Sequence, residues 1–354
     1  ADGRLRGTLQ FAGAIRTSRW AGRLFQPQNL PRPNGYEASM ADDWIEDIKA
    51  GIGECVLENP NRAAAVALRG TIVAEEGRKL VAADLSNIEG RGLAWLAGEQ
   101  WKLDAFRDYD AGTGPDLYKI TAGRILGKHA DDITGDERQL QGKVPELACG
   151  YQGAAGAFGT MAALYGLELT DDEVSRIVQQ WRAANPAIKQ FWYDLEQAAR
   201  DATRWPGKVF HAGKISFTRT GEWLLMRLPS GRFLCYCQPA EVDHPKFEGQ
   251  TSLSYLGVNS YTRRWERIHT YGGKLAENAT QAMARDVLAY NMPAIEEAGF
   301  RIILTVHDEV ITEPLDTDEY TTDRLCTLLA ATPDWADSNL PLAASGFEAY
   351  RYRK

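Results

Sequence analysis

The feature that most constrains the fold of this chain is an apolar segment that runs into three polar residues and out again. Residues 302–306 are Ile-Ile-Leu-Thr-Val, then His307, Asp308 and Glu309 follow, and residues 310–312 are Val-Ile-Thr. Runs rich in Ile and Val are typical of buried strands, so the segment predicts two strands joined by a short turn. Buried carboxylates are costly unless they are paired or bound to a metal. The acids at this turn therefore indicate a function other than packing.

A second strand that ends on an acid lies upstream. Residues 79–83, Lys-Leu-Val-Ala-Ala, lead directly into Asp84. A strand-end aspartate is commonly only a turn former, so either aspartate alone is weak evidence. We predict that Asp84 and Asp308 meet at the tips of neighbouring strands and hold a pair of Mg²⁺ ions. Phosphoryl transfer uses two such ions, and Mg²⁺ takes one or two carboxylates together with phosphate and water oxygens.

Residues 136–151 predict a helix that suits phosphate binding. One face of it carries four side chains spaced four apart: Gln139, Lys143, Leu147 and Tyr151. Pro145 lies inside this stretch, so the helix either bends there or restarts with Pro145 in its first turn. Arg138 and Lys143, near a helix start, would supply positive charge beside free helical N–H groups.

The remaining segments predict a chain of mixed helices and strands. Helical patterns occupy 41–56, 61–70, 90–128, 170–181, 186–202 and 272–291, and a last helix is expected to hold Leu325, Leu328 and Leu329. Alternation and turn residues predict β-hairpins over 208–238, and 240–260 is expected to be a polar surface excursion. The 272–291 helix carries a polar stripe that suits either solvent or a groove: Lys274, Asn278, Gln281 and Arg285.

Length and charge set broad limits on the class of protein. The chain has 354 residues, enough for two or three subdomains, and no apolar run long enough to cross a membrane. It begins without Met or a signal-like segment, so we expect a fragment or a processed piece of a longer protein. The formal net charge of −8 argues weakly against nucleic-acid binding, but arginines are clustered locally, as at Arg16, Arg19 and Arg23.

The cysteines and histidines indicate neither a zinc site nor a disulfide framework. The five cysteines are scattered apart from Cys235 and Cys237, and the five histidines show no metal-ligand spacing. Reduced thiols in a cytoplasmic protein are the expected state.

Taken together, these motifs resemble the polymerase region of family A DNA polymerases, the DNA polymerase I family, and most closely its short bacteriophage members. Residues 84–91, Asp-Leu-Ser-Asn-Ile-Glu-Gly-Arg, resemble motif A, Asp-Tyr-Ser-Gln-Ile-Glu-Leu-Arg. Residues 138–151 resemble motif B, the fingers helix, and residues 306–309 match motif C. Residues 17–31 resemble the segment that grips the primer–template, and residues 277–281 resemble the helix that contacts the template.

The resemblance implies an α+β fold with an antiparallel palm sheet, flanking helices and a mainly helical fingers subdomain. It divides the chain into an N-terminal part of the palm at 1–92, the fingers with a β-hairpin insertion at 93–255, and a C-terminal part of the palm at 256–354. Thumb and exonuclease domains are absent from this chain, so another chain or a removed N-terminal region is expected to supply them. The implied location is the cytoplasm, that of a bacterial host if the protein comes from a phage.

The resemblance also implies roles at the reacting atoms. Asp84 and Asp308 would hold two Mg²⁺ ions, for which Mn²⁺ is expected to substitute, and the Leu85 carbonyl would assist. Glu309 would lie close by without binding the ions directly. Lys143 would act with these aspartates in catalysis.

Further residues are implied to bind the deoxynucleoside triphosphate or the primer–template DNA. Arg138 and Lys143 would hold the triphosphate, and Glu89 would exclude a 2′-hydroxyl. Tyr151 would stack near the templating base or mark the closed state. Tyr118 and Leu147 would line the same nucleotide site. The residues implied to contact DNA are Arg19, Arg23, Gln28, Asn29, Asn278, Gln281 and His307.

Three positions depart from the family pattern. The family arginine sits four residues before the lysine, whereas Arg138 sits five before Lys143 and Gln139 takes the usual place. One residue turns a side chain by about 100° around an α-helix, so Arg138 serves only if the local path differs. Leu147 stands where the family has Phe or Tyr, which implies different handling of chain terminators, and Tyr118 stands where many relatives have His.

The expected function is a template-directed DNA polymerase core that extends a primer 3′ end by two-metal-ion nucleotidyl transfer. A metal-dependent nuclease is an alternative, but it has no need of Lys143, Tyr151 and Glu89 together. A non-catalytic DNA-binding subunit of a replisome is another, against which the intact Asp84 and Asp308 argue. An RNA polymerase of related fold is disfavoured by Glu89.

Overall fold

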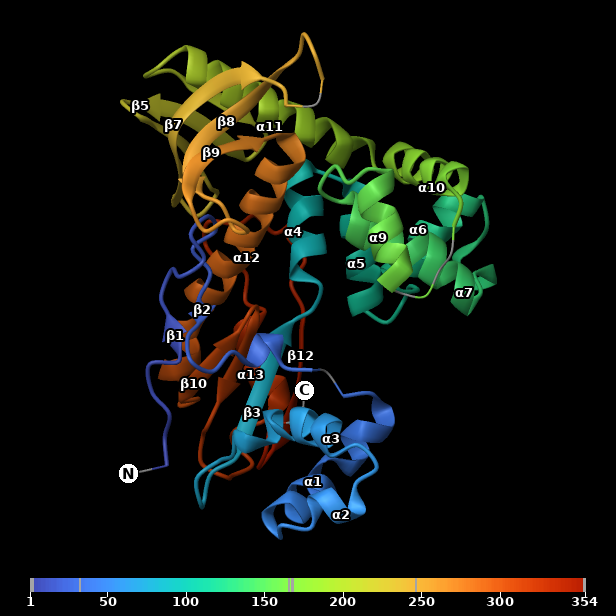
Figure 1. Ribbon diagram of the computed structural model, residues 1–354, viewed down its shortest axis with the longest axis vertical. Coiled ribbons are helices and arrows are strands. Elements are labelled where there is room, and N and C mark those ends of the chain that lie inside the picture. Colours follow the sequence, from blue (N-terminus) through green and yellow to red (C-terminus); the bar gives the residue numbers. More distant parts are fainter. Residues whose placement is uncertain (1–2, 32, 165, 167–168, 246, 353–354) are drawn as a thin grey trace. The chain divides into compact units, whose positions relative to one another are not determined.

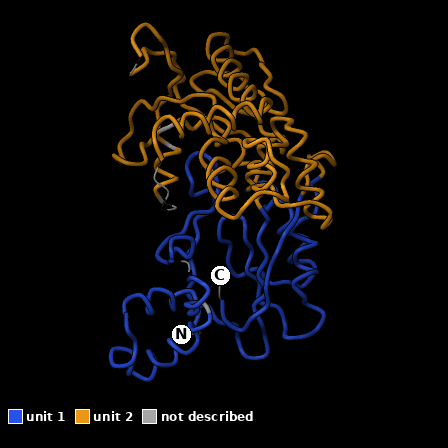
Figure 2. The backbone as a smooth tube through the Cα atoms, turned by 90° about the vertical axis from the view of Figure 1, so that its right-hand side faces the viewer, with its two compact units in different colours: residues 1–86, 285–333, 342–354 blue, residues 87–284, 334–341 orange. Residues whose placement is uncertain are grey.

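The computed structural model describes residues 3–31, 33–164, 166, 169–245 and 247–352 (Figure 1). The chain divides into two compact units, which are coloured separately in Figure 2. Unit 1 comprises residues 1–86, 285–333 and 342–354, and unit 2 comprises residues 87–284 and 334–341. No helix within the described residues is long and apolar enough to cross a membrane.

An antiparallel four-stranded sheet forms the centre of unit 1 (Figure 1). Its strands, in spatial order, are β10 (Ile302–Val306), β11 (Glu309–Thr312), β3 (Leu80–Leu85) and β12 (Ala344–Ala349). Helix α13 (Thr322–Leu329) packs against β3 and β12. The two strands predicted from apolar runs are therefore present, and β3 and β11 are neighbours in one sheet.

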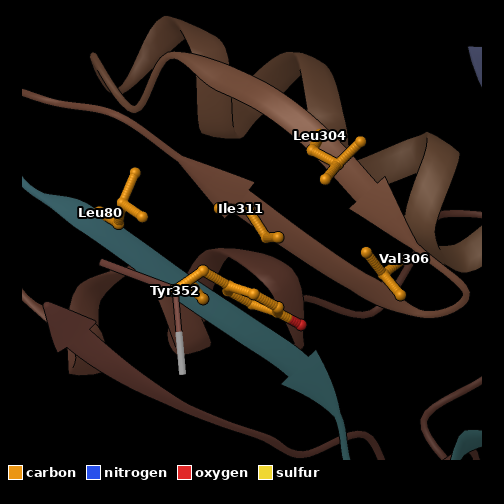
Figure 3. Close-up of a cluster of buried hydrophobic side chains, with 6 residues drawn as sticks. Leu80, Leu304, Val306, Ile311 and Tyr352 are labelled. Atoms are coloured by element: carbon orange, nitrogen blue, oxygen red, sulfur yellow. The ribbon is translucent and has the colours of Figure 1, made fainter. Parts of the chain in front are cut away.

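Alternation along β3 separates an apolar core from an acidic end. Leu80, Ala82 and Asp84 share one face of the strand, because successive side chains point to opposite faces. Leu80 and Ala82 pack in a buried cluster with Leu304, Val306, Ile311 and Tyr352. Figure 3 shows the Tyr352 hydroxyl directed along β3 toward its C-terminal end. Packing of Leu80 and Ala82 therefore fixes this face of β3 up to Asp84, which carries the carboxylate.

Short elements complete unit 1. They are β1 (Leu9–Gln10), β2 (Ala21–Gly22), η1 (Pro27–Asn29), α1 (Gly35–Lys49), α2 (Gly53–Val56), α3 (Pro60–Ala67) and η2 (Arg69–Thr71). Helix α1 begins earlier than predicted because Asn34 and Glu37 form a capping box, in which each side chain accepts the other's backbone N–H. Helix α12 (Gly272–Glu297) contains the boundary between units at residues 284 and 285.

Unit 2 is helical over its first two-thirds. Its helices are α4 (Ile88–Ala97), α5 (Gln100–Asp110), α6 (Leu117–Leu126), η3 (Ala130–Asp132), α7 (Gly135–Glu137), η4 (Arg138–Lys143), α8 (Val144–Cys149), α9 (Ala155–Leu164), α10 (Asp171–Ala184) and α11 (Pro186–Arg204). The predicted capping box at Thr170 and Glu173 starts α10. The stacked rings of Trp181 and Trp192 lie in its core, as packing residues.

A six-stranded antiparallel sheet follows in chain order. Its strands are β4 (Val209–Ala212), β5 (Ile215–Thr220), β6 (Trp223–Arg227), β7 (Phe233–Asp243), β8 (Thr251–Val258) and β9 (Trp265–Thr270). Helix α11 packs against β4, β5, β6 and β7. This sheet is larger than the hairpins predicted over 208–238.

The expectation of a surface excursion over 240–260 is wrong, because β7 and β8 both run through it. The sequence of this segment looks polar because it contains Ser252 and Ser254, which are both buried in the structure. The Ser252 hydroxyl pairs with His269 Nδ1 at 2.6 Å, and the Ser254 hydroxyl donates to the Ala240 carbonyl at 3.0 Å. The sequence division at 255/256 falls inside β8, and the palm and fingers boundaries remain a prediction.

Candidate active site

The two predicted aspartates come to the same end of the unit 1 sheet. Asp84 on β3 is the direct cross-strand partner of Glu309 on β11, and the Leu85 N–H donates to the Asp308 carbonyl at 3.2 Å. Asp308 and His307 form the two-residue turn between β10 and β11, since Val306 pairs with Glu309. His307 has a φ of +58°, a positive value that tight hairpin turns require at their first central residue.

Glu309 is held inside the sheet and away from solvent. It is 2% exposed, and its Oε2 accepts a hydrogen bond from the Tyr352 hydroxyl at 2.7 Å. Burial raises the pKa of Tyr352 above its usual range, and the neighbouring Glu309 carboxylate raises it further. The phenol therefore remains a donor, and its charge-assisted bond offsets part of the cost of burying Glu309.

The donor set at this edge is compatible with Mg²⁺. Asp84 and Asp308 are half-buried carboxylates on adjoining strands. Within the described part of the chain, no group of three or more His, Cys, Asp or Glu side chains is arranged to hold a metal ion. Mg²⁺ needs no such cage, because it commonly takes one or two carboxylates and completes its shell with water and phosphate oxygens.

The predicted phosphate-binding helix has an unusual path in unit 2. Helix α7 leads into η4, a π-helix from Arg138 to Lys143, and η4 continues directly into α8 (Val144–Cys149). The backbone stays helical at Lys143 and Val144, so the helix does not restart at Pro145 but passes through a π turn ahead of it. In a regular α-helix the proline ring would clash with the carbonyl four residues earlier, and the wider turn ahead of it removes this conflict.

The π turn changes which side chains share a face. Its hydrogen bonds join residues five apart, as in the bond from the Val144 N–H to the Gln139 carbonyl. Arg138 and Lys143 are five apart, so they lie about one turn apart in this segment. The local path therefore differs from that of a regular α-helix, and the role of Arg138 stays a prediction.

Arg138 is held in a fixed orientation. Its Nε donates to both carboxylate oxygens of Asp116, at 3.1 and 3.0 Å, and its guanidinium lies 5.1 Å from the centre of the Tyr118 ring. Asp116 also caps α6 by accepting the N–H groups of Tyr118 and Lys119. The terminal amino groups of Arg138 make no hydrogen bond with the described residues, so they are available to a ligand.

Tyr151 and Glu89 are joined within unit 2. The Tyr151 hydroxyl donates to Glu89 Oε2 at 3.1 Å, which links the end of α8 to the first turn of α4. Burial raises the pKa of Tyr151 well above its usual range, with a further contribution from the Glu89 charge. The bond fixes the orientation of the Glu89 carboxylate. Leu147, on α8, is 44% exposed.

Comparison with known proteins finds DNA polymerases both among similar sequences and among similar solved structures. No protein-family model matches the chain. The DNA polymerase of Bacillus phage SP02 is 37% identical over 357 residues, which cover all of this chain and 53% of that protein. This chain is similar to that DNA polymerase over its whole length. DNA polymerase I of Aquifex aeolicus is 34% identical over 128 residues, which cover 36% of the chain and 21% of that protein.

A solved structure supports the same fold. The POL domain of Pol1 from M. smegmatis, in complex with DNA primer-template and dNTP, aligns with a TM-score of 0.63 at 20% identity. The alignment covers all of this chain and 49% of that chain. This polymerase relative therefore has the mixed α and β fold of a polymerase domain, and it spans about half the length of the proteins that it matches throughout.

Residues expected to contact DNA in unit 1 lie mostly at the surface. His307 is exposed at its turn, and Asn29 is exposed with its amide donating to Gln26 Oε1 at 2.7 Å. Arg23 is exposed and donates to the Gly22 carbonyl at 3.0 Å and to the Gln10 side chain. Arg19 and Gln28 are half-buried.

The two expected DNA contacts of α12 in unit 2 differ in access. Gln281 is half-buried, whereas Asn278 is only 3% exposed and donates to the Tyr236 hydroxyl at 3.1 Å. A DNA contact by Asn278 would need that bond to open. Sequence spacing placed Asn278 on the same stripe as Gln281, but the partner from β7 was not visible from spacing.

Sequence reasoning missed a buried ion pair beside Lys143. Lys102 Nζ on α5 lies 2.7 Å from Glu146 Oε2 on α8, and both side chains are almost fully buried. Glu146 Oε1 also accepts from Thr121 Oγ1 at 2.8 Å and from Trp181 Nε1 at 3.0 Å. Helices α5, α6 and α10 thereby fix the segment that carries Lys143. The four residues share no sequence motif, so only the structure assembles them.

Proposed function

We propose that this chain is the palm and fingers core of a template-directed DNA polymerase that adds deoxynucleotides to a primer 3′ end. The observation that carries the proposal is the meeting of Asp84 and Asp308 at one sheet end, in a chain aligned throughout with a phage DNA polymerase. Unit 1, with its four-stranded sheet, is assigned to the palm. Unit 2, with Lys143 and Tyr151, is assigned to the fingers.

Asp84, Asp308 and the Leu85 carbonyl are the groups proposed to hold Mg²⁺ or Mn²⁺ in unit 1. When bound, the two ions would lower the pKa of the primer 3′ hydroxyl and stabilise the pyrophosphate leaving group. The chain's own contribution is to keep two carboxylates at a fixed sheet edge. Glu309 adds negative charge beside Asp84 while its bond to Tyr352 holds it in the sheet.

Lys143 and Arg138 are proposed to bind the triphosphate in unit 2. Both are cations about one turn apart on η4, and phosphate binding needs cations placed before the reaction begins. Asp116 and the Tyr118 ring act as positioning groups for the Arg138 guanidinium.

Replacing Arg138 with alanine is expected to raise the KM for deoxynucleotides, whereas Gln139→Ala is not. A hydrogen bond to a charged group contributes about 1.5–3 kcal/mol, which corresponds to an increase in KM of about 10- to 100-fold. Gln139→Ala is the matched control on the neighbouring position and should change KM by less than about threefold. Single-nucleotide primer extension measures both, and an equal increase for Gln139→Ala would refute the proposed role of Arg138.

Replacing Glu89 with alanine is expected to relax discrimination against ribonucleotides. The substitution removes the carboxylate that would meet a 2′-hydroxyl, and exclusion by shape is typically worth about 10²-fold. The ratio of kcat/KM for deoxy- and ribonucleotides is the measurement. Tyr151→Phe, which keeps the ring but removes its hydrogen bond to Glu89, should give a smaller effect, and an unchanged ratio in Glu89→Ala would remove this role.

Replacing Leu147 with tyrosine is expected to increase dideoxynucleotide incorporation by about tenfold. A new phenol on the exposed face of α8 could supply a hydrogen bond where the 3′-hydroxyl is missing, worth about 1 kcal/mol or more. Leu147→Phe adds the ring without the hydroxyl and serves as the control. Strong dideoxynucleotide use by the unchanged protein would contradict the prediction.

The function is tested by primer extension at low salt with Mg²⁺ and all four deoxynucleotides, beside a reaction without nucleotides. Template-directed extension is the expected result. Shortening of the primer without nucleotides would favour the nuclease. DNA binding without extension would favour the non-catalytic subunit. Extension would also have to fail after the remaining part of a full-length relative is added to the reaction.

A further inference from the structure

A polar pocket in unit 2 lies on the solvent-facing side of the six-stranded sheet. It has a volume of about 330 Å³, and its lining comes from the sheet, from α4 and from residues 335–337. None of the lining residues belongs to the proposed nucleotide or metal sites. The pocket is large enough for a nucleobase-sized group, at the lower end of small-molecule sites.

A row of three polar side chains forms one side of this pocket. His211 on β4 pairs directly with Ser216 on β5, and Ser216 pairs with Arg227 on β6. Direct cross-strand partners share a face and lie about 5 Å apart. These three side chains make no hydrogen bond or ion pair with any residue that the structure describes. The row therefore presents three hydrogen-bonding side chains next to one another without a protein partner in the described part of the chain.

Aromatic side chains continue the row on the same face. Phe233 on β7 is the direct partner of Arg227, and Trp223 lies on the Arg227 face of β6 because it is four residues away along the strand. Phe233 and Trp223 are each 45% exposed. The opposite face, with Phe217 and Met226, is fully buried. The exposed rings thus belong to a solvent face and not to the core.

On the other side of the pocket, the positive charge of Lys214 is balanced by the carboxylate of Asp337. Lys214 Nζ lies 2.5 Å from Asp337 Oδ2 and 4.6 Å from the centre of the Trp95 ring, and Trp95 Nε1 donates to Asp337 Oδ1 at 2.8 Å. Burial alone would raise the pKa of Asp337, but these hydrogen bonds hold it below its usual range. Because Lys214 balances the single lining acid, Arg227 gives the pocket a positive net charge. Trp335 is half-buried beside Trp95 and offers a further ring.

We propose that the exposed face of β4 to β7 binds single-stranded DNA, with a phosphate at the His211–Ser216–Arg227 row and bases against Phe233 and Trp335. An unpaired arginine beside exposed rings suits single-stranded nucleic acid, because its bases present free faces for stacking. Duplex DNA would use the arginine but not the rings. The site does not depend on the proposed polymerase activity, so the two can fail separately.

The test measures binding of a fluorescent oligothymidylate to the full chain by anisotropy over a range of low salt concentrations. Arg227→Ala is expected to weaken binding by about tenfold and to reduce the salt slope by about 0.7, the value for one phosphate contact on a single strand. Trp335→Ala and Phe233→Ala are expected to weaken binding by about 5- to 100-fold, the range for loss of one stacked base.

Three controls make the result decisive. Arg227→Lys should keep most of the binding, and Arg264→Ala, at an exposed arginine between β8 and β9 of the same sheet, should leave it within about twofold. Asp308→Asn should bind the oligonucleotide like the parent, which separates this site from the proposed catalytic one. Because Arg227 is exposed and makes no side-chain bond within the described residues, its variants should unfold at the parent's midpoint.

Several outcomes would overturn the proposal. They are equal losses in Arg264→Ala and Arg227→Ala, equal losses for duplex and single strand, complete displacement by a millimolar mononucleotide or inorganic phosphate, and tighter binding of polyglutamate than of oligothymidylate. The last two would point to a small anion and to an acidic protein partner, respectively.

Discussion

Asp308→Asn is expected to lower primer extension by about 10³-fold or more. Asparagine keeps the shape of the side chain and its suitability for a turn, but removes the negative charge that would hold a metal ion. Metal-assisted stabilisation of a phosphoryl transition state is worth several kcal/mol, and each 1.36 kcal/mol changes the rate tenfold. Steady-state extension by the parent and the variant at equal protein concentration measures the loss.

Asp318→Asn is the matched control, because Asp318 is an exposed aspartate in the same unit that lies outside the sheet. It should retain the parent's rate, and both variants should unfold at the parent's denaturant midpoint. A rate for Asp308→Asn within about tenfold of the parent would contradict the metal-binding role, since a carboxylate ligand is worth more than that.

Lys102→Met is expected to lower the free energy of unfolding by about 3–5 kcal/mol. Methionine fills much of the same space, but it leaves the Glu146 carboxylate buried with only the bonds from Thr121 and Trp181. An uncompensated buried charge is costly because desolvation is no longer offset by a cation. Chemical denaturation followed by tryptophan fluorescence measures the change, since Trp181 and Trp101 lie against Lys102.

Two further variants separate charge from packing. Lys274→Met breaks an exposed pair with Glu277, separated by 2.8 Å, and should cost less than about 1 kcal/mol. The double variant Lys102→Met/Glu146→Leu should recover most of the loss, because an apolar replacement of a buried pair is often neutral. If the double variant is no more stable than Lys102→Met, the cost lies in packing and not in charge.

The strands of the candidate site could be predicted from sequence because their signal is local. Apolar runs around Asp84 and Asp308 define β3, β10 and β11, and the acids mark where those strands end. Pairing of β3 with β11 followed from the chemistry that the two aspartates would share. The same local reasoning failed at β8, where Ser252 and Ser254 are buried although serine is usually an exposed residue.

The remaining parts of the site depend on contacts between distant segments. The path of η4 reflects Pro145 together with close packing on α6, where any side chain at Gly142 would meet the Tyr118 carbonyl at 2.2 Å. The Lys102–Glu146 pair joins α5 to α8, and Asn278 turns inward toward Tyr236. Neither periodicity nor spacing carries information about such partners.

The wide turn of η4 also bears on how chains of this kind can change length. One additional residue in a regular helix would rotate all later side chains by about 100°. A phosphate-binding side chain after that point would then face another direction. Here a single wider turn holds the five-residue spacing between the arginine and the lysine, which stay about one turn apart. We expect that one residue more or fewer in this segment can be taken up by the width of that turn, without rotating the helix that follows.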